Sequence, residues 1–372
     1  MRKLQMRQVL EGREVRFTNF VDEESLAFEN AAVEIQTTAA MEQTLAYAKL
    51  CGREFYLMQT RAADGTPAMQ AIIYLGRPKV LSSFAMASVP NLHRAKNILE
   101  EEFGLKMLRE LGSEIPNAMT LRLQPQRFDA QELTGFEMRA STCGFNLAPP
   151  LGIVRTMLLD LDSTPEALAA KMGQKTRSKI RHASRAKMEL RVLTEESYAA
   201  ACRNATNESR RRSGSDDTPY DFESAFRVAK AHPDRAQIIG LFLKDKPGQL
   251  MAYVIGYKNG ARAEYASAGS FSDPELRSMP FNYFLFWQLA NWARNQGATQ
   301  IDMGGITDGG ENDPLQGVSR FKRSIASLEV ETGREMVIVL RPLRLHLYQG
   351  LKEFKSWLKA EAGQTGLLPA YD

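Results

Sequence analysis

The stretch Ile301-Asp302-Met303-Gly304-Gly305-Ile306, followed by Gly317-Val318-Ser319-Arg320-Phe321-Lys322-Arg323, decides how this chain is interpreted. An apolar strand runs into paired glycines, and an aromatic-lysine pair comes after a polar, glycine-rich loop. Glycines let backbone N–H groups approach a ligand closely, and a lysine can stabilise a developing oxyanion. The pattern indicates a site that holds a reacting carbonyl group. The alternative is a strand-to-loop transition followed by a solvated lysine.

Length and composition set the class of protein. The chain has 372 residues, which favours two domains, and its contents of 44% hydrophobic and 25% charged residues are those of an ordinary globular protein. The three cysteines, Cys51, Cys143 and Cys202, are far apart and form no CxxC pair, so no disulfide framework or zinc site is expected. The basic N-terminus lacks the apolar run of a signal peptide, and no stretch is long enough to span a membrane. A cytoplasmic location is therefore expected.

The order of predicted elements recurs in the two halves of the chain. Each half offers a helix, an antiparallel meander, a second helix and a strand, which predicts an α/β (α+β) fold with two mixed, mostly antiparallel sheets flanked by helices. The first copy is predicted as helices at 39–50 and 92–111 and strands at 54–60, 68–74, 80–85 and 119–123. The second is predicted as helices at 165–187, 196–212, 221–231 and 281–295 and strands at 237–244, 249–257, 261–268 and 298–303.

The stretch 136–150, which ends in two prolines, is the expected boundary between the copies. We expect an N-terminal domain over 1–148, completed by the C-terminal segment 335–372, and a second domain over 149–334. The segment beyond Arg341 has apolar residues at helical spacing and predicts a helix that docks on the body. Contact of this helix with a membrane surface is the alternative.

A helix that carries many cations is predicted after residue 162. Ser163 or Thr164 is its expected N-cap, with Glu166 completing a capping box with Ser163. Eight lysines and arginines against one acid occur in 171–191, whereas a solvated helix normally mixes in acids. We expect a polyanionic partner such as RNA phosphate; the alternative is a merely solvated face. A second basic group ends the next helix, at Arg210, Arg211 and Arg212.

Several kinds of chemistry are disfavoured by missing motifs. The four histidines form no pair at metal-ligand spacing, and no GxSxG motif occurs. No Walker motif or GxGxxG follows a predicted strand. Metal-dependent hydrolysis, nucleotide hydrolysis and hydride transfer are therefore not expected, and neither a metal nor a coenzyme is predicted.

The doubled pattern resembles the GNAT superfamily of N-acyltransferases. Ordinary members bind the pyrophosphate of acetyl-CoA on a loop of the form R/Q-x-x-G-x-G/A before a helix. The matching stretch here, Arg277-Ser278-Met279-Pro280-Phe281-Asn282-Tyr283, has the arginine but neither glycine. The resemblance therefore disfavours coenzyme A as the acyl carrier.

One branch of that superfamily, the Fem-type aminoacyltransferases that build peptidoglycan cross-bridges, is more similar. The stretch 175–183 resembles that family's R-x-x-I-R-K-A motif, and the similarity continues along most of the chain in Arg211, Tyr220, Asp302-Met303-Gly304-Gly305 and Phe321-Lys322. Fem-type enzymes transfer an amino acid from aminoacyl-tRNA to an amine of a peptidoglycan precursor's stem peptide. They consist of two GNAT-like domains and use no metal or coenzyme.

The resemblance assigns roles to particular residues. Lys322 of the Phe321-Lys322 pair is the catalytic candidate, and an oxyanion formed when an amine attacks the activated ester is what a lysine would stabilise. Asp302, Asp308 and Asp313 are alternative bases for the amine proton. The residues expected to contact substrate or RNA are Lys175, Arg177, Lys179, Arg181, Arg211, Tyr220, Gly304 and Gly305.

Two departures from the family concern the acceptor. The N-terminal Q-S-x-x-W-type motif is matched by Gln36-Thr37-Thr38-Ala39-Ala40, so alanine replaces tryptophan, and Thr44 stands about where a lysine is expected. In the family, the tryptophan and the lysine help to hold the precursor's diphosphate. The coiled-coil arm of some members is also missing.

Two other functions remain as alternatives. The first is an N-acyltransferase that uses an acyl-CoA donor through a rebuilt loop, and the second is a non-catalytic protein that binds RNA or another polyanion on a GNAT scaffold. The expected partners of the main hypothesis are aminoacyl-tRNA and a peptidoglycan precursor or another amine-bearing acceptor, with peripheral membrane contact if the acceptor is lipid-linked.

Overall fold

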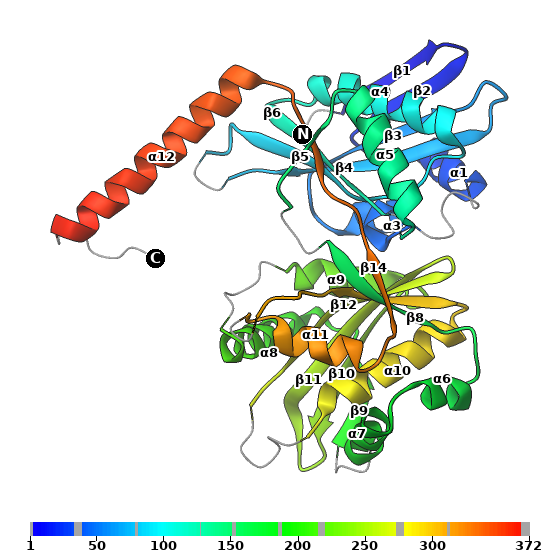
Figure 1. Ribbon diagram of the computed structural model, residues 1–372, viewed down its shortest axis with the longest axis vertical. Helices are drawn as coiled ribbons and strands as arrows, with labels where there is room; N and C mark the ends of the chain where they lie inside the picture. The colour runs from blue at the N-terminus through cyan, green and yellow to red at the C-terminus, as the bar shows by residue number, and fades with distance from the viewer. Residues whose placement is uncertain are drawn as a thin grey trace.

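The computed structural model describes residues 3–32, 39–78, 81–126, 128–150, 154–184, 188–214, 220–272, 279–310 and 313–365. Two sheets form the framework, one above the other in Figure 1. The mixed α/β class predicted from the sequence, with mostly antiparallel sheets flanked by helices, is confirmed. In the first sheet the strand order is β1-β2-β3-β4-β5-β6-β15-β7, and in the second it is β14-β8-β13-β12-β11-β10-β9.

The strands of the first sheet are β1 (Gln5–Leu10), β2 (Arg13–Thr18), β3 (Phe55–Arg61), β4 (Pro67–Gly76), β5 (Ala85–Leu92), β6 (Ala118–Pro125), β7 (Asn146–Leu147) and β15 (Met336–Val339). Those of the second are β8 (Arg155–Asp160), β9 (Met188–Val192), β10 (Ala236–Leu243), β11 (Lys246–Asn259), β12 (Arg262–Ser270), β13 (Gln300–Gly305) and β14 (Leu328–Glu331). Each sheet contains one parallel pair, β5 with β6 and β12 with β13. The helix that joins each parallel pair covers the sheet: α4 (Ile98–Glu114) in the first and α10 (Phe281–Asn295) in the second.

The remaining helices are α1 (Glu23–Ala31), α3 (Leu45–Leu50), α5 (Ala130–Thr142), α6 (Pro165–Lys171), α7 (Gln174–Ser184), α8 (Ala199–Arg212), α9 (Phe222–Ala231), α11 (Gln316–Arg323) and α12 (Pro342–Thr365), with 3-10 turns η1 (Met41–Gln43) and η2 (Glu196–Tyr198). Two apolar cores lie on the outer sides of the halves, under α4 and α5 and under α10. A third core joins the halves, because Met41 and Tyr47 of the first pack with Phe226 and Tyr257 of the second.

Some predicted elements are corrected. The strand expected at 80–85 lies at Ala85–Leu92, where Ala85, Ala87 and Val89 alternate into the core up to the buried Leu92. The helix expected from residue 92 therefore begins later, at Ile98, behind the N-cap Asn97, whose side chain accepts from the Glu100 N–H. Proline and asparagine, which occur here at residues 90 and 91, are disfavoured within strands.

The cation-bearing helix expected at 165–187 is two helices. α6 ends at Lys171, Met172 is extended, and α7 begins at Gln174, since Gly173 interrupts the pattern. Thr164, not Ser163, is the N-cap, so the capping box predicted with Ser163 is absent. Residues 185–187 of the expected helix lie outside the described residues.

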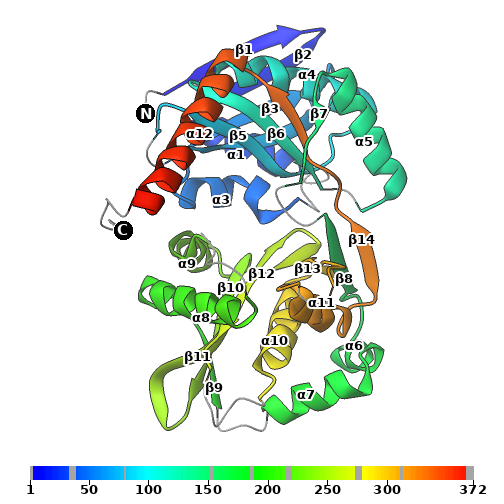
Figure 2. The ribbon, with the colours of Figure 1, turned by 60° about the vertical axis from the view of Figure 1, so that its left-hand side comes forward.

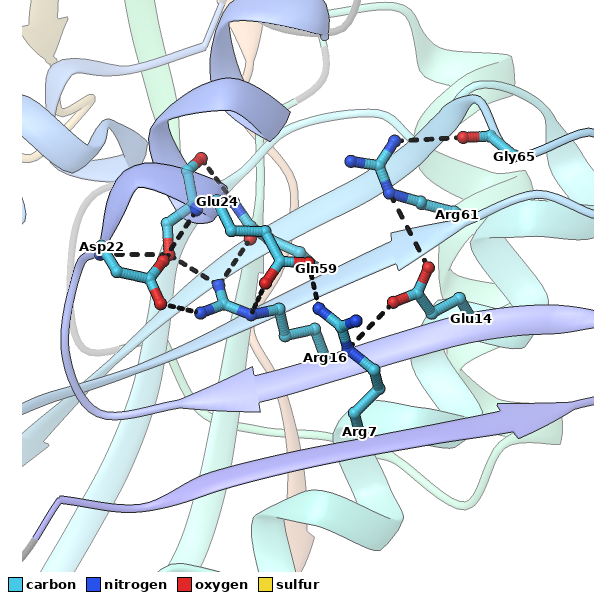
Figure 3. A network of polar contacts seen from close by, with 9 residues as sticks. Arg7, Glu14, Arg16, Asp22, Glu24, Gln59, Arg61 and Gly65 are labelled. Atoms are coloured by element: carbon cyan, nitrogen blue, oxygen red, sulfur yellow. Dashed lines mark hydrogen bonds and ion pairs between the residues drawn. The ribbon is translucent and has the colours of Figure 1, made fainter.

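The first hairpin, β1 with β2, was not predicted from the sequence. A buried arginine, Arg16, ties it to α1 in the network of Figure 3, where its guanidinium donates to Ser25 Oγ (2.6 Å) and pairs with Asp22 and with Glu24 (3.3 Å). The Asp22 side chain also accepts from the Ser25 N–H and caps α1. Arg16 is 4% exposed, so these carboxylates supply the partners that a buried guanidinium requires.

The C-terminal helix predicted beyond Arg341 is confirmed as α12, which extends away from the body in Figure 1. Its first turns contact the first half, where Tyr348 packs on Phe84 and Arg344 donates to Asn117 Oδ1 (2.8 Å). Leu347, which lies between Arg344 and Tyr348, remains 56% exposed. Among the described residues, no helix combines the length and apolarity needed to cross a bilayer.

Close packing of α8 on β12 depends on Gly269. A Cβ at this position would lie 2.6 Å from the Thr206 backbone nitrogen, so the helix would have to move away from the strand. We expect Gly269→Ala to reduce the free energy of unfolding by about 2 kcal/mol, measured by urea denaturation. The matched control is Gly248→Ala on β11, where a Cβ meets nothing within 4 Å. Equal stabilities of the two variants would contradict this account.

Candidate active site

The site forms where two neighbouring strands separate. β12 and β13 pair in parallel at only three positions, of which Glu264 opposite Asp302 is the last. Beyond it, β12 continues along β11 to Ser270, while β13 pairs with β8 on its other side. The paired glycines of the sequence, Gly304 and Gly305, lie at this opening.

Gly304 has a conformation that suits glycine alone. Its φ is +75°, and a Cβ would lie 3.4 Å from the Lys322 Nζ. Its N–H donates to Asp302 Oδ1 (2.8 Å), which fixes the turn at the strand end. The glycine therefore leaves the lysine ammonium uncovered on this side of the strand.

Lys322 reaches the opening from α11, a helix that was not predicted from the sequence. Its Nζ donates to the Gly305 carbonyl (2.7 Å), and the residue is 7% exposed. Burial lowers the pKa of Lys322 to about 8, and the nearby carboxylate of Asp302 partly opposes this shift. At neutral pH the ammonium is therefore charged but poorly solvated, as electrostatic stabilisation of an oxyanion requires.

Neighbouring elements hold α11 in place. Ser319, buried on the helix, accepts the Thr307 N–H at its Oγ (3.0 Å), and Thr176 of α7 donates to the Ser324 carbonyl (2.9 Å). Phe321 packs among aromatic rings, with centroids 4.9 Å from Tyr283 and 6.3 Å from Tyr265. Phe321 therefore forms an apolar wall beside the lysine.

A cavity of about 900 Å³, called here the donor pocket, opens in front of Lys322. The end of α8, the outer half of β12, the start of α10 and α11 enclose it. Four of its lining residues are cations, and among the described residues that line it there is no carboxylate. The cations are Lys179, Arg210, Arg320 and Lys322. This field favours an anionic ligand that carries phosphate.

The start of α10 closes one end of the donor pocket and offers few free amides. Pro280 is the N-cap and has no N–H, the Phe281 N–H donates to the Met279 carbonyl (3.0 Å) and the Tyr283 N–H donates to the Pro280 carbonyl (3.1 Å). A pyrophosphate group at a helix start is normally held by such N–H groups. Arg277 and Ser278 of the stretch compared with the coenzyme A loop lie outside the described residues.

The structure brings together six of the predicted site residues. Those that line the donor pocket are Lys179, Tyr220, Gly304, Gly305, Phe321 and Lys322. Lys175, Arg181 and Arg211 are exposed and line neither this pocket nor the cavity described next. Arg177 instead donates to the carbonyls of Ala170 (3.2 Å) and Met172 (2.8 Å), which gives it a role at the end of α6.

A second cavity, of about 200 Å³, lies on the other side of the same strand end and is called here the rear cavity. Its lining comes from both halves of the chain, including Asn91 and Gln124 of the first. Asp302 lies here, where it pairs with Arg262 and accepts from Thr156 Oγ1. The two cavities share a wall made of Tyr265, Ala266, Gly304 and Gly305.

The other two candidate bases are also engaged. Asp308 pairs with Arg323 (2.6 Å) and with Arg155. Asp313 accepts from Thr307 Oγ1 (2.7 Å) and from the Leu315 N–H (2.8 Å), and these bonds lower its pKa. None of the three aspartates lines the donor pocket, and each already forms hydrogen bonds or ion pairs.

Sequence reasoning did not assign Arg320, Tyr283 or Glu264 to the site. Arg320 lies in the quoted stretch 317–323, and Tyr283 lies in the stretch 277–283 that was compared with the coenzyme A loop. Both residues could therefore have been assigned from the sequence. Glu264 had a weaker signal, an acid inside an otherwise uncharged stretch of strand after Arg262. Among the described residues there is no cluster of histidine, cysteine and acidic side chains that could hold a metal ion.

The buried ammonium of Lys322 makes the stability of the fold depend on pH. The pKa of this group is about 8 when folded and 10.5 when unfolded, so its charge opposes folding below pH 8 and the penalty disappears as pH rises to 10.5. We expect Lys322→Met to be stabilised relative to the parent at pH 7, and this difference to shrink by pH 10. Urea denaturation at both values measures it, and a difference independent of pH would contradict the lowered pKa.

Comparison with known proteins supports this fold. Residues 170–323 match the acetyltransferase (GNAT) domain family. FemX is similar over 89% of this chain and 99% of its own, with a TM-score of 0.71 and 15% identity. A tandem GNAT protein from the clavulanic acid biosynthesis pathway is similar over 88% of this chain and 98% of its own, with a TM-score of 0.53 and 14% identity.

The C-terminal domain of a putative lysylphosphatidylglycerol synthetase from Agrobacterium fabrum is similar over 85% of this chain and 92% of its own, with a TM-score of 0.50 and 14% identity. No curated protein sequence matches the chain. The predicted Fem-type double GNAT-like fold is confirmed. The chain therefore carries a GNAT acyltransferase domain within a double GNAT-like fold similar to that of FemX.

Proposed function

We propose that this protein transfers an amino acid from aminoacyl-tRNA to an amine of a peptidoglycan precursor. The observation that carries the proposal is the donor pocket, which is lined by cations and ends at the Lys322 ammonium beside Gly304 and Gly305. The 3′ end of a charged tRNA combines phosphates with an activated ester. The cations suit the phosphates, and the strand opening suits the ester.

The chemistry needs little from the protein beyond positioning. The ester carbonyl is already activated, so no enzyme nucleophile is required when an amine is held against it. Attack forms a tetrahedral oxyanion, and the Lys322 ammonium, poorly solvated and fixed by the Gly305 carbonyl, would stabilise it. Phe321 and Tyr283 form an apolar wall that would limit water near the ester.

The cations around the pocket support an RNA donor. Lys179 extends from α7 to Tyr283, with its Nζ 3.0 Å from the hydroxyl and 4.3 Å from the ring centroid, so the exposed cations of α7 continue to the pocket wall. Arg210 lines the pocket from α8 and Arg320 from α11. Phosphates on either side of a bound nucleotide would thus meet cations from three helices.

An acyl-CoA donor is the second candidate, and the match of residues 170–323 to an acetyltransferase domain favours it. The α10 start weighs against it, because its N–H groups at Phe281 and Tyr283 are already bonded. Titration calorimetry with acetyl-CoA distinguishes the two donors. Micromolar binding of acetyl-CoA, together with no binding of charged tRNA at low salt, would reverse the order proposed here.

For the acceptor we propose only a chemical class, an amine on a peptidoglycan precursor. A lipid-linked precursor would bring the protein to a membrane surface. The exposed Leu343 and Leu347 of α12 are apolar groups that such a surface would contact. A cytoplasmic site of action is part of the same proposal.

Lys322→Ala should reduce transfer at least about 100-fold while the protein remains folded, because it removes the charge that stabilises the oxyanion. Transfer is measured with labelled aminoacyl-tRNA and a muropeptide acceptor, followed by the mass of the product. Circular dichroism and the melting temperature control for folding. Unchanged transfer by the folded variant would exclude this role for Lys322.

Arg320→Ala and Arg210→Ala should weaken binding of aminoacyl-tRNA, and each should lower the slope of log K against log salt by about 1, because each removes a phosphate contact. Filter binding at several salt concentrations measures both quantities. Lys230→Ala is the control, since this exposed lysine of α9 lines neither cavity. If the control weakens binding as much as the pocket variants, the donor pocket is not the RNA site.

A further inference from the structure

The two cavities that meet at Gly304 and Gly305 differ in charge. Described residues of the donor pocket include four cations and no carboxylate, whereas the rear cavity is lined by Glu264 and Asp302 together with arginines. Among the described residues that line the two cavities, the carboxylates that could accept from an amine therefore lie on one side of a thin wall, and a set of cations without carboxylates lies on the other. The wall is thin because its glycines have no side chains.

Glu264 occupies the rear cavity close to this wall. It is the last residue of β12 to pair with β13, opposite Asp302 and two positions before Gly304 in the register. Its side chain is 20% exposed, so it is largely buried yet reaches the cavity. Asp302 already bonds Arg262, Thr156 and the Gly304 N–H, which leaves Glu264 as the less engaged carboxylate.

Charged and polar groups from three elements surround the Glu264 carboxyl group. Arg262 on its own strand lies 3.9 Å away, Asp302 faces it from β13, and η1 contributes the Glu42 carboxylate and the Met41 N–H. The pKa of Glu264 is raised to about 7, mainly by burial; Arg262 and the Met41 N–H lower it, and the carboxylates of Glu42 and Asp302 add to the rise. A carboxylate in this range accepts a proton near neutral pH and can release it again.

Resting on the proposed aminoacyl transfer, we propose that the rear cavity receives the primary amine of the acceptor and that Glu264 takes its proton. The volume of about 200 Å³ fits the end of an amine-bearing side chain rather than a whole precursor. Asn91 and Gln124 offer amide groups for the neighbouring polar atoms of the acceptor. The amine nitrogen would approach the ester from the face of the wall opposite Lys322.

The step balances without a further reactant. The amine nitrogen bonds to the ester carbonyl carbon, the bond between that carbon and the ribose oxygen breaks, and an amide and a ribose hydroxyl result. The acceptor arrives as an ammonium and gives one proton to a Glu264 oxygen. The nitrogen loses a second proton to water as the amide forms, and the ribose oxygen takes up one proton from water. Glu264 then loses its proton to water, so the cycle ends with the enzyme unchanged.

The first test measures amine binding and needs no donor. Ligand-observed NMR compares Nα-acetyl-lysine amide with Nα-acetyl-norleucine amide, which has the same chain without the amine. We expect at least tenfold tighter binding of the lysine probe by the wild type, and loss of this preference in Glu264→Gln. Glu223→Gln is the matched control, since Glu223 of α9 pairs with Arg203 and lines neither cavity.

The second test measures transfer against pH. We expect the wild-type kcat to fall below about pH 7, because Glu264 must be deprotonated, and above about pH 8, because Lys322 must be protonated. Glu264→Gln should lower kcat about 100-fold and remove the lower limb, with the KM for aminoacyl-tRNA changed less than twofold. Glu264→Asp should recover part of the rate, which a merely structural role would not predict.

The two tests distinguish a failure of the amine site at Glu264 from a failure of the proposed aminoacyl-tRNA donor. If charged tRNA gives no transfer but the lysine probe binds only when Glu264 is present, the donor is wrong and the amine site stands. If transfer occurs and Glu264→Gln keeps the wild-type rate and pH profile, the role of Glu264 is overturned. Equal binding of the two probes by the wild type overturns the amine site itself.

Discussion

The separation of β12 from β13 is the constraint on which the rest of the site depends. Backbone pairing holds the strands together for three positions, and each then satisfies its hydrogen bonds with a different partner, β11 or β8. This arrangement opens the sheet without leaving a row of unpaired groups, which would be costly inside a protein. The opening allows a side chain from one face, Lys322, to act on atoms that reach it from the other.

A difference in charge between the two cavities accompanies that opening. Ile301 and Met303 of β13 point into the apolar core under α10, whereas Asp302 lies on the opposite face with Arg262 and Glu264. The alternation of a strand thus sends the acids to the side that faces the first half of the chain. The cations come instead from helices around the donor pocket. One short strand therefore separates a pocket lined by cations from a cavity in which acids and arginines lie together.

Much of the framework followed from the sequence, because apolar periodicity and turn residues are local signals. The meander β10-β11-β12, the helix α10 and the end of a strand at Gly304-Gly305 were predicted from such patterns. The β1–β2 hairpin and α11 were not, since they are short and depend on tertiary partners such as the Arg16 carboxylates and the Thr307–Ser319 contact. The same limit applies to the site. Motifs placed Lys322, but the function inferred for Glu264 depends on burial and on the junction of two cavities, which no spacing encodes.

The path of the chain between the two sheets has a topological consequence. The chain leaves the first sheet at β7 and returns to it at β15, and Leu147 pairs directly with Met336. It enters the second sheet through β8 and leaves it through β14, and Arg155 pairs with Glu331, as the neighbouring β8 and β14 in Figure 2 show. The outgoing and returning parts of the chain are thus paired both where they leave the first sheet and where they meet the second. The second sheet is therefore an insertion within the first unit, and the two units do not simply follow one another along the chain. An inserted unit of this kind can be exchanged in evolution through two adjacent crossover points, which leaves the host sheet intact.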